Sequence, residues 1–93
     1  MSRMTERLQD RSDPPAAPLL RALWLGLRGE WDSAHAIVQS DSGADAAWVH
    51  AWLHRIEGDA ANAAYWYRRA GKAAAEGGTD AEGEAIAQAL SAR

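Results

Sequence analysis

LLRALWLGLRGEWDSAHAIV (residues 19–38) aligns without gaps with WVHAWLHRIEGDAANAAYWY (residues 48–67). Gly29 and Gly58 are equivalent points of the two copies, 29 residues apart. In each copy, apolar and small residues at helical spacing precede the glycine and a second such group follows it. Self-similarity of this kind is typical of helical repeats, in which each unit is a hairpin of two helices. The alignment therefore predicts two helical hairpins with one plan.

The composition predicts one all-α domain. The chain has 93 residues, abundant Ala, no Phe and few β-branched residues, so few of its residues favour β-strands. The absence of Cys indicates a reducing compartment. The net charge of −3, spread along the chain, argues against nucleic-acid binding. We also expect no membrane span and no signal peptide, because no apolar segment is long enough for either, and hence a cytoplasmic protein.

Helix-capping residues predict where the elements begin and end. We expect residues 1–13 to be flexible or a short helix and residues 14–93 to form the domain. Asp13, Asp45 and Asp59 are predicted N-caps, and Thr79 with Glu82 reads as a capping box. The predicted units are hairpins over residues 14–41 and 45–71 and a C-terminal capping helix over residues 80–91. That last helix is expected to cover the exposed end of the second hairpin.

The segment GDAANAAYWYRRAG (residues 58–71) resembles the second half of a tetratricopeptide or Sel1-like repeat. Its first-half counterpart departs from that pattern, with Ala47, His50-Ala51 and His54 at the pattern positions. The 29-residue spacing is also shorter than the ~34 residues of a tetratricopeptide. The chain is similar as well to short, mostly alphaproteobacterial, uncharacterised proteins sharing an AWVHAxLHRxEGDxxNAxYWYRRAG core. These resemblances imply a fold and a protein-binding role, without a chemistry.

His50 and His54 are the sharpest candidates for a site. Their i, i+4 spacing places two imidazoles on one side of a helix, the spacing needed to hold one metal ion. Glu57 follows at the edge of that face, and only His35 of the other hairpin could complete a three-histidine set. The alternative is that both rings fill the hairpin interface and bond to backbone carbonyls or to the Tyr67 hydroxyl.

A second candidate is a protein-binding surface on the helix before Gly71. Tyr65 is expected to be exposed beside Arg68 and Arg69, and Tyr and Arg are common interface anchors. Trp31, directly after the first turn, is another predicted anchor. The alternatives are a solvated face with arginines near a helix C-terminus, and a Trp31 that closes the first hairpin.

No nucleophile constellation and no phosphate-binding glycine loop is present, so we expect a non-enzymatic protein without a cofactor. The sequence favours a small interaction module that binds a protein or peptide or self-associates as a homodimer. Two hairpins fall short of the ~3 repeats that usually stabilise such a stack, which favours a partner. The alternative function is metal or small-ligand binding by His50 and His54.

Overall fold

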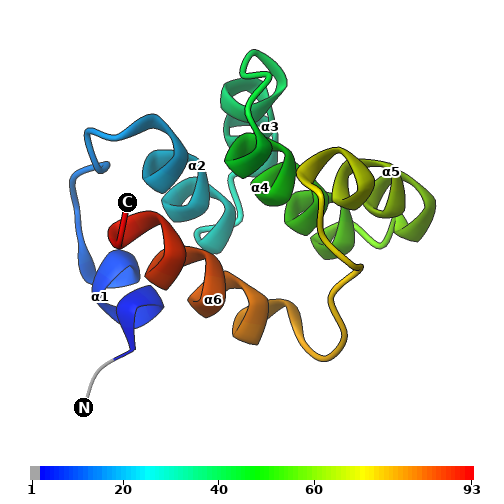
Figure 1. The fold of residues 1–93 in the computed structure, drawn as a ribbon. Coiled ribbons are helices and arrows are strands. Elements are labelled where there is room, and N and C mark those ends of the chain that lie inside the picture. Colours follow the sequence, from blue (N-terminus) through cyan, green and yellow to red (C-terminus); the bar gives the residue numbers. More distant parts are fainter. Residues whose placement is uncertain (1–2) are drawn as a thin grey trace.

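The computed structural model describes residues 3–93, and within them the chain forms six α-helices and no strand (Figure 1). The predicted all-α fold is therefore confirmed. The helices are α1 (Met4–Asp10), α2 (Pro18–Leu27), α3 (Trp31–Gln39), α4 (Ala44–Ile56), α5 (Ala60–Ala70) and α6 (Thr79–Ser91). No helix in this described part of the chain is both long and apolar enough to cross a membrane.

The turns α2–α3 and α4–α5 have the same backbone geometry. Gly29 and Gly58 adopt φ values of +82° and +85°, in the left-handed region that favours glycine. In the second turn the N–H of Gly58 donates to the carbonyl of Arg55 at 3.1 Å, and the N–H of Asp59 donates to that of His54 at 2.9 Å. The first turn has equivalent bonds. Each turn thus satisfies two carbonyls at a helix end and reverses the chain.

One of the three predicted aspartate caps is confirmed and two are wrong. Asp59 caps α5, because its carboxylate accepts a bond from the backbone N–H of Asn62. Asp13 does not open α2, which begins only at Pro18, where the fixed φ of proline suits the first helical position. Asp45 lies one residue inside α4 and binds the guanidinium of Arg93 instead.

Helix α6 packs against α4, α2 and α1 (Figure 1). It therefore packs on the second hairpin through α4, as the capping expectation has it, and also covers α2 and α1, which that expectation does not include. The reason is its small-residue face: Gly83 lets the backbone approach the indole of Trp52, which donates from Nε1 to the carbonyl of Thr79 at 2.8 Å. The predicted capping box is wrong, since Thr79 is inside the helix and the Glu82 side chain is buried.

Helix α1 is held to α6 by a carboxylate. Glu84 accepts bonds from the backbone N–H of Met4 at 3.1 Å, from the backbone N–H of Thr5 at 2.9 Å and from the Thr5 hydroxyl at 3.0 Å. A residue of α6 thus caps the N-terminus of α1 across the fold, in place of a local cap. The described part of the 1–13 segment therefore packs with the rest of the domain.

The Glu84 cap predicts a pH dependence. Hydrogen bonds to its carboxylate lower the pKa of Glu84 from an ordinary value of 4.5 to about 2, and the bond from the Thr5 backbone has the largest effect. Because this carboxyl is more acidic in the folded chain, its stabilisation is present above pH 4.5 and is lost as the pH falls toward 2. Glu84→Gln should lower the unfolding free energy by about 1.5–3 kcal/mol at pH 7.

Urea unfolding of the wild type and Glu84→Gln between pH 3 and 7 measures this effect. The difference between the two proteins should shrink as the pH falls, while Glu76→Gln, at an exposed position, serves as the control. A difference that stays constant with pH would contradict the cap.

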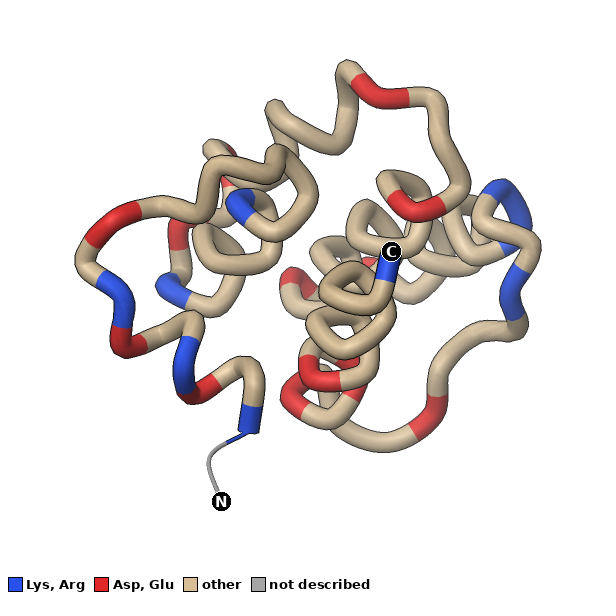
Figure 2. Tube along the Cα trace, turned by 60° about the vertical axis from the view of Figure 1, so that its left-hand side comes forward, with Lys and Arg blue, Asp and Glu red and all other residues tan. Residues whose placement is uncertain are grey.

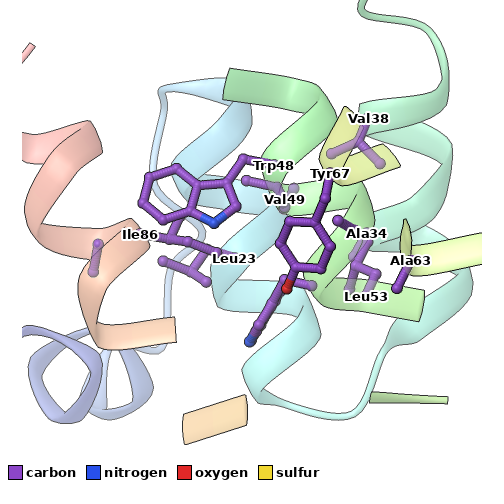
Figure 3. Packing of buried hydrophobic residues seen from close by; sticks show 13 residues of the cluster. Leu23, Ala34, Val38, Trp48, Val49, Leu53, Ala63, Tyr67 and Ile86 are labelled. Atoms are coloured by element: carbon purple, nitrogen blue, oxygen red, sulfur yellow. The ribbon is translucent and has the colours of Figure 1, made fainter. Parts of the chain in front are cut away.

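The core forms where α2, α4 and α6 meet and extends between the hairpins (Figure 3). Four of its side chains have no exposed surface: Leu23, Val49, Trp52 and Ile86. Charged residues of both signs are interspersed along the rest of the described chain (Figure 2). The aromatic density of the second hairpin thus builds much of the core, as large rings suit a domain this small.

Candidate metal centre

The three histidines of the chain converge at the junction of α3 and α4. His50 and His54 lie on one face of α4 with their rings stacked at 5.0 Å, as their spacing predicts. The Nε2 atoms of His35 and His50 are 3.0 Å apart. One ring nitrogen of each histidine lies within 4.8 Å of one from the other two. The third histidine named from the sequence therefore joins the pair.

Two indoles enclose the three imidazoles. Trp31 stacks on His35 with ring centroids 4.7 Å apart, and Trp66 stacks on His50 at 3.7 Å. Trp31 is itself fixed by a bond from its Nε1 to the carbonyl of Leu53, at 2.6 Å. It thus ties α3 of the first hairpin to α4 of the second, a different contact from the expected closure of the first hairpin. The rings of the cluster are restrained on two sides by flat aromatic surfaces.

The cluster is buried on one side and open on the other. His50 is 2% exposed and His54 is 6% exposed, whereas His35 is half-buried. Burial first, and then the neighbouring rings of His35 and His54, lower the pKa of His50 to about 4. Burial, followed by the charge of His54, also lowers the pKa of His35, against the opposing effects of Glu57 and Asp32. At neutral pH both imidazoles are therefore neutral and carry a lone pair, the form that binds a metal.

Hydrogen bonds account for only some of the ring nitrogens of the cluster. The Nδ1 atom of His54 is 2.6 Å from Oε1 of Glu57, so its Nε2 is the atom left to meet the other rings. The Nδ1 atom of His50 is buried without a hydrogen-bond partner. Neither histidine bonds to the Tyr67 hydroxyl, which instead donates to Glu82. The local satisfaction expected from the packing alternative is thus incomplete for His50.

A second group, His54 with Glu57 and Asp59, has its ligand atoms within the same 4.8 Å limit. It is the weaker candidate, because both carboxylate oxygens of Asp59 already accept bonds from Asn62, each at 3.1 Å, in capping α5. Since the two groups share His54, the three-histidine group is the one whose atoms are available.

The four residues predicted for protein binding do not form one surface. Tyr65 is 43% exposed on α5, and its hydroxyl accepts a bond from Arg69 at 3.1 Å. The Arg69 guanidinium also lies over the ring of Trp66, 5.3 Å from its centroid. Arg68 is exposed on the same helix, while Trp31 is half-buried in the histidine cluster. Tyr65 and the two arginines thus share α5, and Trp31 does not join them.

Sequence reasoning missed a buried carboxylate. Glu82 is 6% exposed and accepts bonds from Nε1 of Trp48 at 3.1 Å, from the Tyr67 hydroxyl and from Arg55 at 2.6 Å. Its position four residues before the buried Ile86 was the available signal, since i and i+4 share a helix face. Both of its oxygens accept bonds within the protein, so Glu82 joins α4, α5 and α6.

Comparison with known proteins finds no matching family model, no similar curated protein and no similar solved structure. The tetratricopeptide and Sel1 resemblance consequently stays a prediction from the sequence.

Proposed function

We propose that this protein binds a divalent transition-metal ion through His35, His50 and His54. The observation that carries the proposal is the meeting of all three imidazoles, from two helices of different hairpins, with ring nitrogens within 4.8 Å of one another. Three histidines are an established ligand set for zinc. Imidazole nitrogen also suits copper, nickel and iron, whereas magnesium and calcium require oxygen ligands.

The distance between His35 and His50 is close to the one that a metal ion needs. Two nitrogens that bind a tetrahedral zinc at about 2.0–2.1 Å are roughly 3.3 Å apart. The Nε2 atoms of His35 and His50, at 3.0 Å, need to separate only slightly. Three protein ligands leave one coordination position, and the half-buried ring of His35 marks the side from which an ion can enter.

The repeat itself supports a role beyond packing. In the first copy the residues equivalent to His50, His54 and Glu57 are Arg21, Leu25 and Arg28. The residue equivalent to His35 in the second copy is Ala64. The first hairpin therefore forms without counterparts of His50, His54 and Glu57, and the second without a counterpart of His35. These four side chains, which the hairpin plan does not require, meet in space, and that meeting supports a ligand site.

We expect untagged protein to bind one Zn²⁺ per chain, measured by calorimetric titration of chelator-treated protein. His35→Ala should weaken binding by more than the roughly 10–100-fold that loss of an outer-shell partner costs, because it removes a ligand. His35 is the least buried of the three, so its replacement disturbs the core least. His50→Ala/His54→Ala should abolish binding.

Bound metal should also raise the unfolding free energy, by about 2.7 kcal/mol at a free concentration one hundred times the Kd. Asp32→Asn, at an exposed neighbour of His35, is the control for general charge effects. A wild-type protein that takes up no Zn²⁺, Cu²⁺ or Ni²⁺ would rule the proposal out.

The interaction role expected for Tyr65, Arg68 and Arg69 stays a prediction. Its support is the exposed ring of Tyr65, which Arg69 holds in place on the outer face of α5. Binding of a metal ion and binding of a protein are compatible, because Trp66 lies between this surface and His50. The non-enzymatic character of the protein is likewise part of the proposal, which includes no reaction.

A further inference from the structure

We propose that Glu57 is a positioning residue for the metal, acting through His54. This inference rests on the proposed function, since it assigns a partner to one of the three ligands. The Oε1 atom of Glu57 lies 2.6 Å from Nδ1 of His54. A carboxylate can only accept there, so the ring must hold its proton on Nδ1, and Nε2 is left with the lone pair that a metal requires.

The backbone fixes Glu57 in this place. Glu57 is the residue that ends α4, and Gly58 follows it in the left-handed conformation. The backbone bonds of that turn hold Asp59 against the carbonyl of His54, so the end of the helix is rigid. Glu57 and His54 are three residues apart, the spacing at which two side chains meet along a helix. The carboxylate is thus presented to Nδ1 by the hairpin turn itself.

The rest of the cluster depends on this orientation. His54 stacks beside His50 and meets the ring of Trp31 edge-on at 5.5 Å, so its plane is restrained but its tautomer is not. Among residues 3–93, the bond to Glu57 is the one hydrogen bond that distinguishes the two nitrogens of His54. Glu57 also adds a negative charge near an ion held by three neutral ligands, which favours the divalent cation.

Two observations in the chain set Glu57 apart from an ordinary surface carboxylate. Its side chain is 39% exposed, yet it makes its bond to a histidine that is 6% exposed. At the equivalent turn position the first hairpin has Arg28, whose guanidinium lies over Trp24. The turn forms with an arginine or a glutamate at this position, so the turn does not require Glu57. The bond to His54 is what the glutamate adds.

The test measures Zn²⁺ affinity and the tautomer of His54 in three variants. Glu57→Ala should raise the Kd about 10–100-fold, the usual effect of removing a partner of a metal-binding histidine. Glu57→Gln keeps an oxygen that accepts the bond from Nδ1, so its Kd for Zn²⁺ should rise less than that of Glu57→Ala. Glu30→Gln, which removes an exposed carboxylate just after the first hairpin turn, should leave the Kd unchanged.

Long-range ¹H–¹⁵N spectra of the metal-free protein report the tautomer of His54 directly. If Glu57 had only a structural role, its replacement would not change this tautomer. His54 should carry its proton on Nδ1 in the wild type, and Glu57→Ala should shift it toward the other tautomer. Wild-type affinity in Glu57→Ala, or a proton on Nε2 of His54 in the wild type, would overturn the role of Glu57 and leave the metal site standing. A wild-type chain that binds no Zn²⁺ would instead refute the proposed function, and this role with it.

Discussion

Trp52→Ala is expected to lower the unfolding free energy by about 3–5 kcal/mol, the usual range for removing a buried tryptophan. Trp52 has no exposed surface, and its ring lies against Gly26 of α2 and Gly83 of α6. Its Nε1 also donates to the carbonyl of Thr79, at the start of α6. One side chain therefore holds three helices together. Because a domain of this size has only about 5–15 kcal/mol in total, much of the chain should unfold on mild heating.

Urea unfolding followed by circular dichroism measures the loss. Trp52→Phe is the matched control, because it keeps an aromatic ring and removes the Nε1 donor and part of the volume. Its loss should be smaller than that of Trp52→Ala. A Trp52→Ala protein as stable as the wild type would mean that α6 does not depend on this ring.

Glu82→Ala is expected to cost about 3–5 kcal/mol, the range found when one partner of a buried ion pair is removed. The change leaves the Arg55 guanidinium, 18% exposed, without its carboxylate. It also leaves the Trp48 indole and the Tyr67 hydroxyl without an acceptor. Burial first, and then the bond to Glu82, raise the pKa of Tyr67, so this hydroxyl stays a donor at every pH of interest.

Glu82→Gln separates charge from shape. Its amide retains one acceptor oxygen but turns an NH₂ group toward donors, so its loss should approach that of Glu82→Ala. Glu76→Ala, in the exposed connection before α6, is the control and should change little. Thermal and urea unfolding measure the unfolding free energy of each variant. A Glu82→Ala protein that loses no more unfolding free energy than Glu76→Ala would refute the buried network.

The parts of the fold that follow from local chemistry could be predicted from the sequence. Gly29 and Gly58 end helices because few other residues adopt a positive φ, and the aspartate at 59 caps a helix because its carboxylate reaches a free N–H. Predictions of this kind depend only on residues a few positions apart. The pairing of His50 with His54 on one face belongs to the same class.

The parts that depend on packing between distant segments could not be predicted. Thr79 and Glu82 carry a local capping signal, but burial of the carboxylate against Trp48 and Arg55 wins over it. The place of α6 depends on a small-residue face that meets Trp52, which no local pattern shows. The sequence predicts His35 as the third histidine, yet its distance from His50 depends on how α3 lies against α4. The alternatives for the histidines could be weighed only after that packing was known.

The carboxylate of Glu84 that caps α1 has a consequence for the order in which the fold can assemble. Its partner Met4 lies 80 residues earlier in the chain. During synthesis the N-terminus of α1 therefore has no cap until nearly all of the described chain has been made. Contacts of such long range slow folding, because the loop between them must close before they form. The hairpins, whose contacts are local, can form early, while α1 and α6 dock late and together.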